Sequence, residues 1–265
     1  MKSASIDIGN SRVKVLSEEY GFAAFEIGEA DGSWLEDLLA FIEKHDTSYS
    51  WGISSVNPDT ETEVIDMLID RSITIVSAEF LLYNQTLIDV SQVEGAGSDR
   101  VFGVIGALKY ATPPFITIDC GTAITINYLD SNRVFRGGAI IPGITTQLRA
   151  LEHFTGKLPL LTATYDTASY GTTTSQAMTI GTLWGAIGAI REIVSRIGKA
   201  IGSESIPIII TGGEHLFVTF GLEGIELITC PHLVVEGILA AQKEFFSSAN
   251  TTERTNEQMD VIQNS

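Results

Sequence analysis

The sequence predicts an α/β protein built from two related domains. The first observation is an internal repeat: residues 5–16, SIDIGNSRVKVL, align without a gap with residues 117–128, TIDCGTAITINY. Each copy reads as a strand, a tight turn and a second strand, with partial alternation of apolar residues. The second observation is that strands alternate with helical patterns after the first repeat, as in an α/β layer. Two such units predict a nucleotide cleft between the domains.

Each repeat carries the pattern D-x-G-[NT] at its turn. A glycine lets the backbone approach a ligand, and a threonine hydroxyl with free backbone N–H groups can hold phosphate oxygens. A carboxylate at the same turn is suited to a cation. The alternative is two ordinary hairpins in which Asp and Gly serve the turn alone. The aligned pairs are Asp7 and Asp119, Gly9 and Gly121, and Asn10 and Thr122.

Composition narrows the class of protein. The formal net charge of −17 argues against a nucleic-acid partner, whose phosphates need neutralising by Lys and Arg. The apolar runs are too short for a membrane span, and no basic start with an apolar segment precedes the first strand. Cys120 and Cys230 have neither metal-ligand spacing nor a disulfide framework. We therefore expect a cytoplasmic protein that binds no nucleic acid and no membrane.

The elements of the first domain follow from periodicity. Three strands open the chain, and an amphipathic helix, a buried strand, a second helix and a further strand follow. This order is the layout of a ribonuclease H-like layer. The expected strands are 5–9, 11–17, 22–27, 51–56 and 73–76, and the expected helices are 31–45 and 58–69. We expect the domain to span 1–111 and to end near Ala111–Pro114.

Residues 94–110, EGAGSDRVFGVIGALKY, form a separate signal in the first domain. Two glycines and Ser98 interrupt the chain, and a helix begins with Asp99 and Arg100 in or near its first turn. Gly103 and Gly106 on that helix are small enough for another backbone to pack close. A carboxylate at a helix N-terminus can simply interact with the helix dipole. It can also be a general base held at the mouth of a site, and periodicity leaves both interpretations open.

The second domain is predicted over 112–248, with a disordered polar tail at 249–265. Glycines in the first half of its long helix indicate close contact with another helix, within the chain or across a dimer. The glycine pair after its last strand, in TGGE at 211–214, is either a turn or a place where a base or ribose lies on the backbone. Beyond the repeat, the expected strands are 134–140 and 206–210, the helices 144–154, 174–197 and 233–246, and the loop 155–171.

Six short segments, in order and at compatible spacing, resemble the type III pantothenate kinase family. They are DIGNSRVK at 7–14, GSDR at 97–100, DCGTAITI at 119–126, GGAIIPG at 137–143, TGGE at 211–214 and PHLVVEGI at 231–238. The resemblance implies two duplicated ribonuclease H-like domains of the sugar kinase, actin and heat-shock ATPase superfamily, and a homodimer. It also implies ATP as phosphoryl donor, Mg²⁺, a monovalent cation such as K⁺ or NH₄⁺, and pantothenate as acceptor.

The resemblance assigns roles to individual residues. Asp99 is expected to be the catalytic base, Asp119 to hold the monovalent cation, and Thr122 to contact ATP. Thr174, at the start of the long helix, matches a substrate-binding threonine, with Thr173 as a possible error of register. The first nucleotide-binding segment comprises Asp7, Gly9, Asn10, Ser11, Arg12 and Lys14, with Asp7 near the divalent ion. The pantothenate pocket comprises Gly97, Ser98, Asp99, Arg100 and Thr174.

One departure from the family pattern concerns the acceptor site. The family usually carries an aromatic residue and a proline before G-x-D-R, whereas residues 86–97 read TLIDVSQVEGAG, with Val90 near the aromatic position. Two alternatives to a pantothenate kinase follow. One is a nucleotide-binding regulatory protein of the same fold with weak or no activity, and the other is a kinase for another small alcohol.

Overall fold

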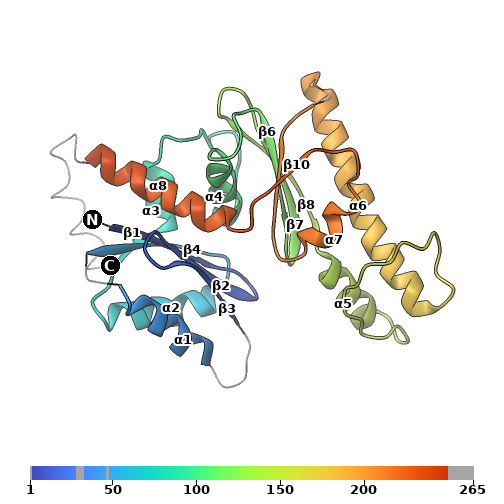
Figure 1. Cartoon of the computed structure of the whole chain (residues 1–265), viewed down its shortest axis with the longest axis horizontal. Coiled ribbons are helices and arrows are strands. Elements are labelled where there is room, and N and C mark those ends of the chain that lie inside the picture. Colours follow the sequence, from blue (N-terminus) through green and yellow to red (C-terminus); the bar gives the residue numbers. More distant parts are fainter. Residues whose placement is uncertain (1, 28–32, 46–47, 204, 250–265) are drawn as a thin grey trace. The chain divides into compact units, whose positions relative to one another are not determined.

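The computed structural model describes residues 2–27, 33–45, 48–203 and 205–249 (Figure 1). The chain forms two compact units: unit 1 holds the residues up to Lys109 and those from His232 onward, and unit 2 is Tyr110–Pro231. The first junction lies next to the boundary predicted at 111–114. The last helix, predicted to belong to a domain spanning 112–248, instead packs in unit 1. Of the predicted disordered tail, residues 250–265 lie outside the described residues.

Unit 1 is a five-stranded mixed sheet with helices on both faces (Figure 1). The strand order is β3-β2-β1-β4-β5, with β1 antiparallel to β2, β2 antiparallel to β3, and β1, β4 and β5 parallel. Periodicity did not predict the short helix α3 of this unit. The strands are β1 (Lys2–Ile8), β2 (Arg12–Ser17), β3 (Gly21–Glu26), β4 (Tyr49–Ser55) and β5 (Thr74–Ser77), and the helices are α1 (Ser33–Ile42), α2 (Pro58–Ile69), α3 (Ala78–Asn84), α4 (Ser98–Ala107) and α8 (Leu233–Ala249).

Alternation along β1 decides which helices each side chain meets. Ala4, Ile6 and Ile8 are fully buried in a core built with residues of α1 and α2. Ser5 points to the other face, where its hydroxyl donates to the carbonyl oxygen of Val235 in α8 at 2.8 Å. Because successive side chains of a strand alternate between faces, Asp7 lies on the same face as Ser5. The sheet therefore presents Asp7 to the side that carries α4 and α8 (Figure 1).

Glycines let α4 and α8 pack with their backbones in contact. A Cβ on Gly106 would lie 2.1 Å from the carbonyl oxygen of Leu233, and a Cβ on Gly237 would lie 1.8 Å from that of Phe102. The close approach predicted at Gly106 is confirmed, and α8 is the partner. The space at Gly103 is larger, since a Cβ there would lie 3.9 Å from the nearest atom. The α4–α8 contact fixes the helix whose N-terminus carries Asp99.

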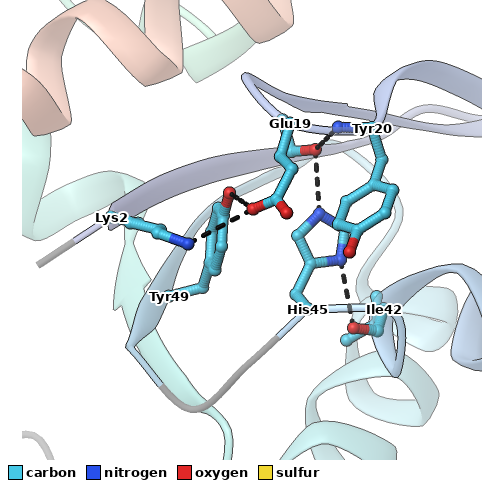
Figure 2. Close-up of polar contacts among 7 residues, drawn as sticks. Lys2, Glu19, Tyr20, Ile42, His45 and Tyr49 are labelled. Carbon is cyan, nitrogen blue, oxygen red and sulfur yellow. Dashed lines mark hydrogen bonds and ion pairs between the residues drawn. The ribbon is translucent and has the colours of Figure 1, made fainter.

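A polar cluster joins the starts of β1 and β4 to the β2–β3 turn, at the sheet end opposite Asp7 (Figure 2). Glu19 accepts from Tyr49 Oη at 2.9 Å and pairs with Lys2 Nζ at 3.2 Å. These two hydrogen bonds lower the pKa of Glu19, that of Tyr49 having the larger effect. His45 Nδ1 donates to the carbonyl oxygen of Ile42 at the end of α1. His45 Nε2 also lies 2.8 Å from the hydroxyl of Ser17, the last residue of β2, so His45 connects the end of α1 to this end of the sheet.

Unit 2 repeats the strand order of unit 1. Its sheet runs β10-β9-β6-β7-β8, with β6 antiparallel to β7, β7 antiparallel to β8, and β6, β9 and β10 parallel. This equivalence confirms the predicted duplication, although α7 and β10 were not predicted. The strands are β6 (Phe115–Cys120), β7 (Ala123–Leu129), β8 (Phe135–Pro142), β9 (Ile208–Thr211) and β10 (Leu227–Thr229), and the helices are α5 (Ile144–Phe154), α6 (Thr174–Ile201) and α7 (His215–Thr219).

The two hairpins differ by one residue at the turn. Asp7 lies opposite Lys14 in the first hairpin, whereas Asp119 lies opposite Thr125 in the second. Seven positions separate the first pair and six the second, so the first turn is one residue longer. The gap-free alignment of the repeats is therefore correct through the first strand and the turn glycine and slips by one residue in the second strand.

The long helix α6 combines a buried face with an open one. Met178, Leu183 and Ile190 lie in the core of unit 2. By contrast, a Cβ added at any of three glycines, Gly181, Gly185 and Gly188, would meet no atom within 4 Å in the described part of the chain. By length and composition, α6 is the one helix among the described residues that could cross a membrane, with 33% of its apolar window buried. The close helix contact predicted at these glycines is not made by the described chain itself.

Candidate functional site

The carboxylate of Asp7 is buried at the end of β1. Its residue is 4% exposed, and Lys14 stands opposite it in β2 with Nζ 3.4 Å from Oδ2. The lysine side chain remains 29% exposed, so its ammonium group can contact both the carboxylate and a ligand outside. The hairpin register places a cation beside the anion because the two residues are directly paired across the strands.

The N-terminus of α4 lies on the same face and is tied to the sheet through two serines. Ser54 is the neighbour of Asp7 on β4, and its buried hydroxyl lies 2.8 Å from the hydroxyl of Ser98. Asp99 folds back over the helix start and accepts from the backbone N–H of Arg100 at 2.8 Å. Gly97 makes room for this arrangement, since a Cβ there would lie 2.6 Å from Asp99 Oδ1.

These contacts bring four charged residues together: Asp7, Lys14, Asp99 and Arg100, which we call the unit 1 cluster. Burial raises the pKa of Asp7, the nearby charge of Lys14 opposes that effect, and the negative charge of Asp99 raises the pKa further. Burial also lowers the pKa of Arg100, while Asp99 counteracts this change. The sequence elements at 7–14 and 97–100 therefore form one electrostatic unit, with two carboxylates and two cationic groups.

The turn between β1 and β2 is closed by a hydrogen bond from Gly9 N–H to the carbonyl oxygen of Arg12 at 2.9 Å. Asn10 and Ser11 at its tip are exposed. The Arg12 Nε atom lies 2.5 Å from Glu26 Oε1 across β2 and β3. Arg12 thus stabilises the hairpin in this structure, while the tip leaves polar groups accessible to a ligand.

In unit 2, the main chain of the β6–β7 turn is held by α5. The carbonyl oxygen of Thr122 accepts from Gly143 N–H at 2.9 Å and from Thr146 Oγ1 at 2.6 Å. Asp119 is the penultimate residue of β6 and lies beside Gly212, which has φ +96° and whose added Cβ would lie 2.5 Å from Asp119 Oδ1. The strand end and the glycine pair of TGGE are therefore in direct contact.

Thr174 is the first residue of α6 and is exposed. The preceding Thr173 is the N-cap, since its side chain accepts from Gln176 N–H at 3.2 Å. Both side chains are exposed, but only the hydroxyl of Thr173 caps the helix. Thr174 belongs to unit 2, whereas the other residues of the predicted pantothenate pocket, Gly97–Arg100, belong to unit 1.

The residues present fit a divalent cation near Asp7. For the Asp7 carboxylate, the effects of burial and of Asp99 exceed that of Lys14, so a further positive charge beside it is favourable, and oxygen is the ligand that Mg²⁺ prefers. Within the described ranges, no group of three or more Asp, Glu, His or Cys side chains forms a metal site by itself. A site with one or two carboxylates suits Mg²⁺, which completes its coordination shell with water and substrate phosphates.

Similarity to known protein families identifies the family of this chain. The model of one family, "Type III pantothenate kinase", matches residues 5–196, well over half of the chain. The chain belongs to the type III pantothenate kinase family. The matched range includes both hairpins and the N-terminus of α4. It also includes the start of α6, whereas TGGE and α8 lie beyond it.

Individual relatives agree with this membership. The type III pantothenate kinase of Rhodopirellula baltica is 27% identical over 276 aligned residues, which cover 90% of this chain and 98% of that one. A Campylobacter jejuni structure, described as a Baf family transcriptional activator, has a TM-score of 0.60 at 18% identity, covering 94% of this chain and all of that one. The activator of 2-hydroxyisocaproyl-CoA dehydratase from Clostridium difficile, solved with bound ADPNP, has a TM-score of 0.53 at 12% identity, covering 95% and 98%. The two structures share the actin and heat-shock ATPase type of fold with this type III pantothenate kinase family member.

Sequence reasoning did not assign two residues that the structure places in these clusters. In the sequence, Ser54 is only part of a strand end, and nothing in the pattern indicates that it would meet Ser98. Glu214 belongs to TGGE, but no motif predicts a partner for its side chain. The signal available in both cases was a polar residue at or near the carboxyl end of a buried strand: Ser54 lies in the last two residues of β4, and Glu214 lies three residues after β9.

Proposed function

We propose that this protein transfers the γ-phosphoryl group of ATP to the primary hydroxyl of pantothenate, forming 4′-phosphopantothenate in the first step of coenzyme A synthesis. The observation that carries the proposal is the unit 1 cluster. It joins Asp7 and Lys14 of the first hairpin to Asp99 and Arg100 of α4 within the segment that matches the family. Phosphoryl transfer needs alignment and neutralisation of charge more than covalent help, and this cluster offers both.

The chemistry assigns a separate task to each group. Asp99 accepts the proton of the acceptor hydroxyl while that oxygen attacks the γ-phosphorus and the bond to the β-phosphate oxygen breaks, releasing ADP. Lys14 offsets negative charge on the phosphates. When bound, Mg²⁺ at Asp7 supplies further charge neutralisation. Burial and Asp99 disfavour the ionised form of Asp7, and a cation bound beside it would favour that form.

We propose that the turns of both units bind ATP, the first through Gly9–Arg12 and Lys14 and the second through Thr122. Asp119 is the proposed site of the monovalent cation, K⁺ or NH₄⁺. A carboxylate oxygen at the end of β6 is a suitable hard ligand for it. Each turn exposes polar groups that can meet phosphate oxygens, and the main chain of Thr122 is anchored by α5.

The acceptor is proposed to bind at the start of α4. Gly97 and Ser98 provide backbone and hydroxyl contacts, and Arg100 pairs with the pantothenate carboxylate. Thr174 is the proposed further contact because its side chain, unlike that of Thr173, is not used as the helix cap. The segment 86–97 carries no aromatic residue, so Val90 offers a smaller apolar surface there.

The same proposal includes a cytoplasmic homodimer. The open glycine face of α6 suits close packing against a second copy of this helix. The other face of α6 belongs to the core of unit 2, and an exposed face of small, uncharged residues on such a helix favours contact with another protein chain.

An ADP-release assay with purified protein, Mg²⁺ and K⁺ tests the proposal. ADP release should depend on pantothenate and saturate with it, and a panel of other small primary alcohols should give lower kcat/KM. Tight ATP binding without release on any alcohol would instead indicate a nucleotide-binding regulatory protein. Faster release with a different alcohol would identify a kinase for another acceptor.

A further inference from the structure

Glu214 is a carboxylate outside the residues assigned above that contacts three segments of unit 2. It follows β9 and the glycine pair of TGGE. Its side chain reaches the N-terminus of α5, where Oε2 accepts from Ile144 N–H at 2.9 Å and Oε1 accepts from Thr145 N–H at 3.1 Å. Its own N–H donates to the carbonyl oxygen of Cys120 at 2.8 Å.

The carboxylate replaces the cap that α5 does not provide for itself. The N-cap residue Gly143 has no side chain and makes no side-chain cap hydrogen bond. The first N–H groups of a helix need acceptors, and a negative charge there is favoured by the helix dipole. Both oxygens of Glu214 are used, one for each N–H, so the side chain fixes the helix start in direction as well as position.

The helix start in turn fixes the turn of the second hairpin. Gly143 N–H and Thr146 Oγ1 both donate to the carbonyl oxygen of Thr122, at 2.9 and 2.6 Å. A Cβ on Gly143 would lie 2.0 Å from the carbonyl oxygen of Gly121, so the two backbones are in contact. Any displacement of the α5 N-terminus is therefore passed directly to Thr122.

Together these contacts close a ring: β6 to Glu214, Glu214 to α5, α5 to Thr122, and Thr122 back to β6 through the turn. We propose that Glu214 is a positioning residue for ATP, which holds the α5 N-terminus and thereby places Thr122 against the phosphates. This inference rests on the proposed function because Thr122 is taken to bind ATP. If the Glu214 cap served folding alone, its loss would lower the stability of the protein but would not weaken the binding of ATP more than the binding of adenosine.

Glu214→Gln is the variant that tests the ring. The amide keeps the size of the side chain, but its NH₂ group cannot accept from a backbone N–H, so one of the two bonds is lost. The backbone bond from residue 214 to Cys120 stays, and so does the glycine turn beside it. We expect calorimetry to show about tenfold weaker binding of ATP, with adenosine affinity changed by less than about twofold. Glu226→Gln, the same charge change at an exposed position of unit 2, should leave both affinities unchanged.

A double-mutant cycle separates positioning from a general loss of structure. If Glu214 acts through Thr122, the variant carrying both Thr122→Val and Glu214→Gln should bind ATP no more weakly than Thr122→Val alone, within about twofold. Additive losses would overturn the proposal, since residues that act independently add.

A second route avoids any dependence on folding of the Glu214 variant. Thr146→Val is nearly isosteric and removes only the hydroxyl bond to Thr122, so we expect about threefold weaker ATP binding with adenosine unaffected. Thr155→Val, which removes a comparable hydroxyl bond to Leu151 near the other end of α5, is the matched control and should match the wild type.

Equal losses of ATP and adenosine affinity in Glu214→Gln, or wild-type ATP affinity in both Glu214→Gln and Thr146→Val, would overturn the inference. These measurements need no acceptor. A wild-type protein that binds ATP and shows the predicted pattern but does not phosphorylate pantothenate would refute the proposed function alone. A wild-type protein with no affinity for ATP would overturn both.

Discussion

Gly97→Ala should separate the position of the Asp99 carboxylate from its mere presence. Gly97 has φ −56° and ψ 143°, a conformation that alanine adopts without strain. A Cβ there would lie 2.6 Å from Asp99 Oδ1, whereas ordinary contact begins at 3.4 Å. The difference, 3.4 minus 2.6, means that the carboxylate must move by about 0.8 Å.

The expected loss of activity follows from that displacement of the carboxylate. A misplacement of about 1 Å at a reacting group can reduce the rate by about 100-fold, so we expect kcat to fall between about 10-fold and 100-fold. The hydrogen bond from Arg100 N–H to Asp99 Oδ1 is also disturbed, which should lower the free energy of unfolding by about 1 kcal/mol. ATP affinity should be unchanged, because the added methyl group is directed at the proposed base.

The assay is steady-state ADP release with pantothenate, accompanied by calorimetric titration of ATP and by denaturant unfolding. Gly103→Ala is the matched control on the same helix. Its Cβ would have 3.9 Å to the nearest atom, and alanine is favoured over glycine in a helix interior by about 1 kcal/mol. This control should be fully active and slightly more stable. Wild-type turnover in Gly97→Ala would refute the assignment of Asp99 as a group whose placement matters.

Two further variants test the electrostatics and the packing of unit 1. The pKa of Asp7 in the folded protein is raised above its ordinary value of 3.8, which applies to the unfolded chain. At a pH between the ordinary and the raised pKa, the folded state therefore binds a proton that the unfolded state does not. The free energy of unfolding falls as the pH rises through the raised pKa. Asp7→Asn should therefore be more stable than the wild type at about pH 7.5, with an advantage that shrinks toward about pH 4 in urea titrations; a less stable Asn variant at neutral pH would contradict this. Gly237→Ala places a Cβ 1.8 Å from the carbonyl oxygen of Phe102, so this variant should lower the free energy of unfolding by about 3 kcal/mol. An unchanged urea midpoint would show that the backbones of α4 and α8 are not in contact as described.

The duplicated fold could be predicted because the signal is local and occurs twice. Each D-x-G turn lies between two short alternating strands, and both the pattern and the turn residues act within about a dozen positions. The one-residue difference between the turns could not be predicted, because the sequences align without a gap and only the pairing of Asp7 with Lys14 reveals it. The assignment of α8 to unit 1 also depends on long-range packing, which the periodicity of the helix does not contain.

The candidate site could be predicted in part for the same reason. The motifs at 97–100 and 7–14 are separate signals in the sequence, and the alternation along β1 together with the α4–α8 contact explains why they meet. Ser54 and Glu214 could not be assigned because their partners lie 44 and 70 residues away in the sequence. Contacts of that range are set by the strand order of each sheet, and local motifs do not contain that order.

Product analysis on the wild type and Asp99→Asn tests the central claim most directly. Each protein is incubated with ATP, pantothenate, Mg²⁺ and K⁺, phosphorylated pantothenate is measured by mass spectrometry, and ATP affinity is measured in parallel. We predict that the wild type forms the product, whereas Asp99→Asn forms it at least about 100-fold more slowly with unchanged ATP affinity. No phosphorylated pantothenate from the wild type, or an equal rate from the Asn variant, would contradict the account.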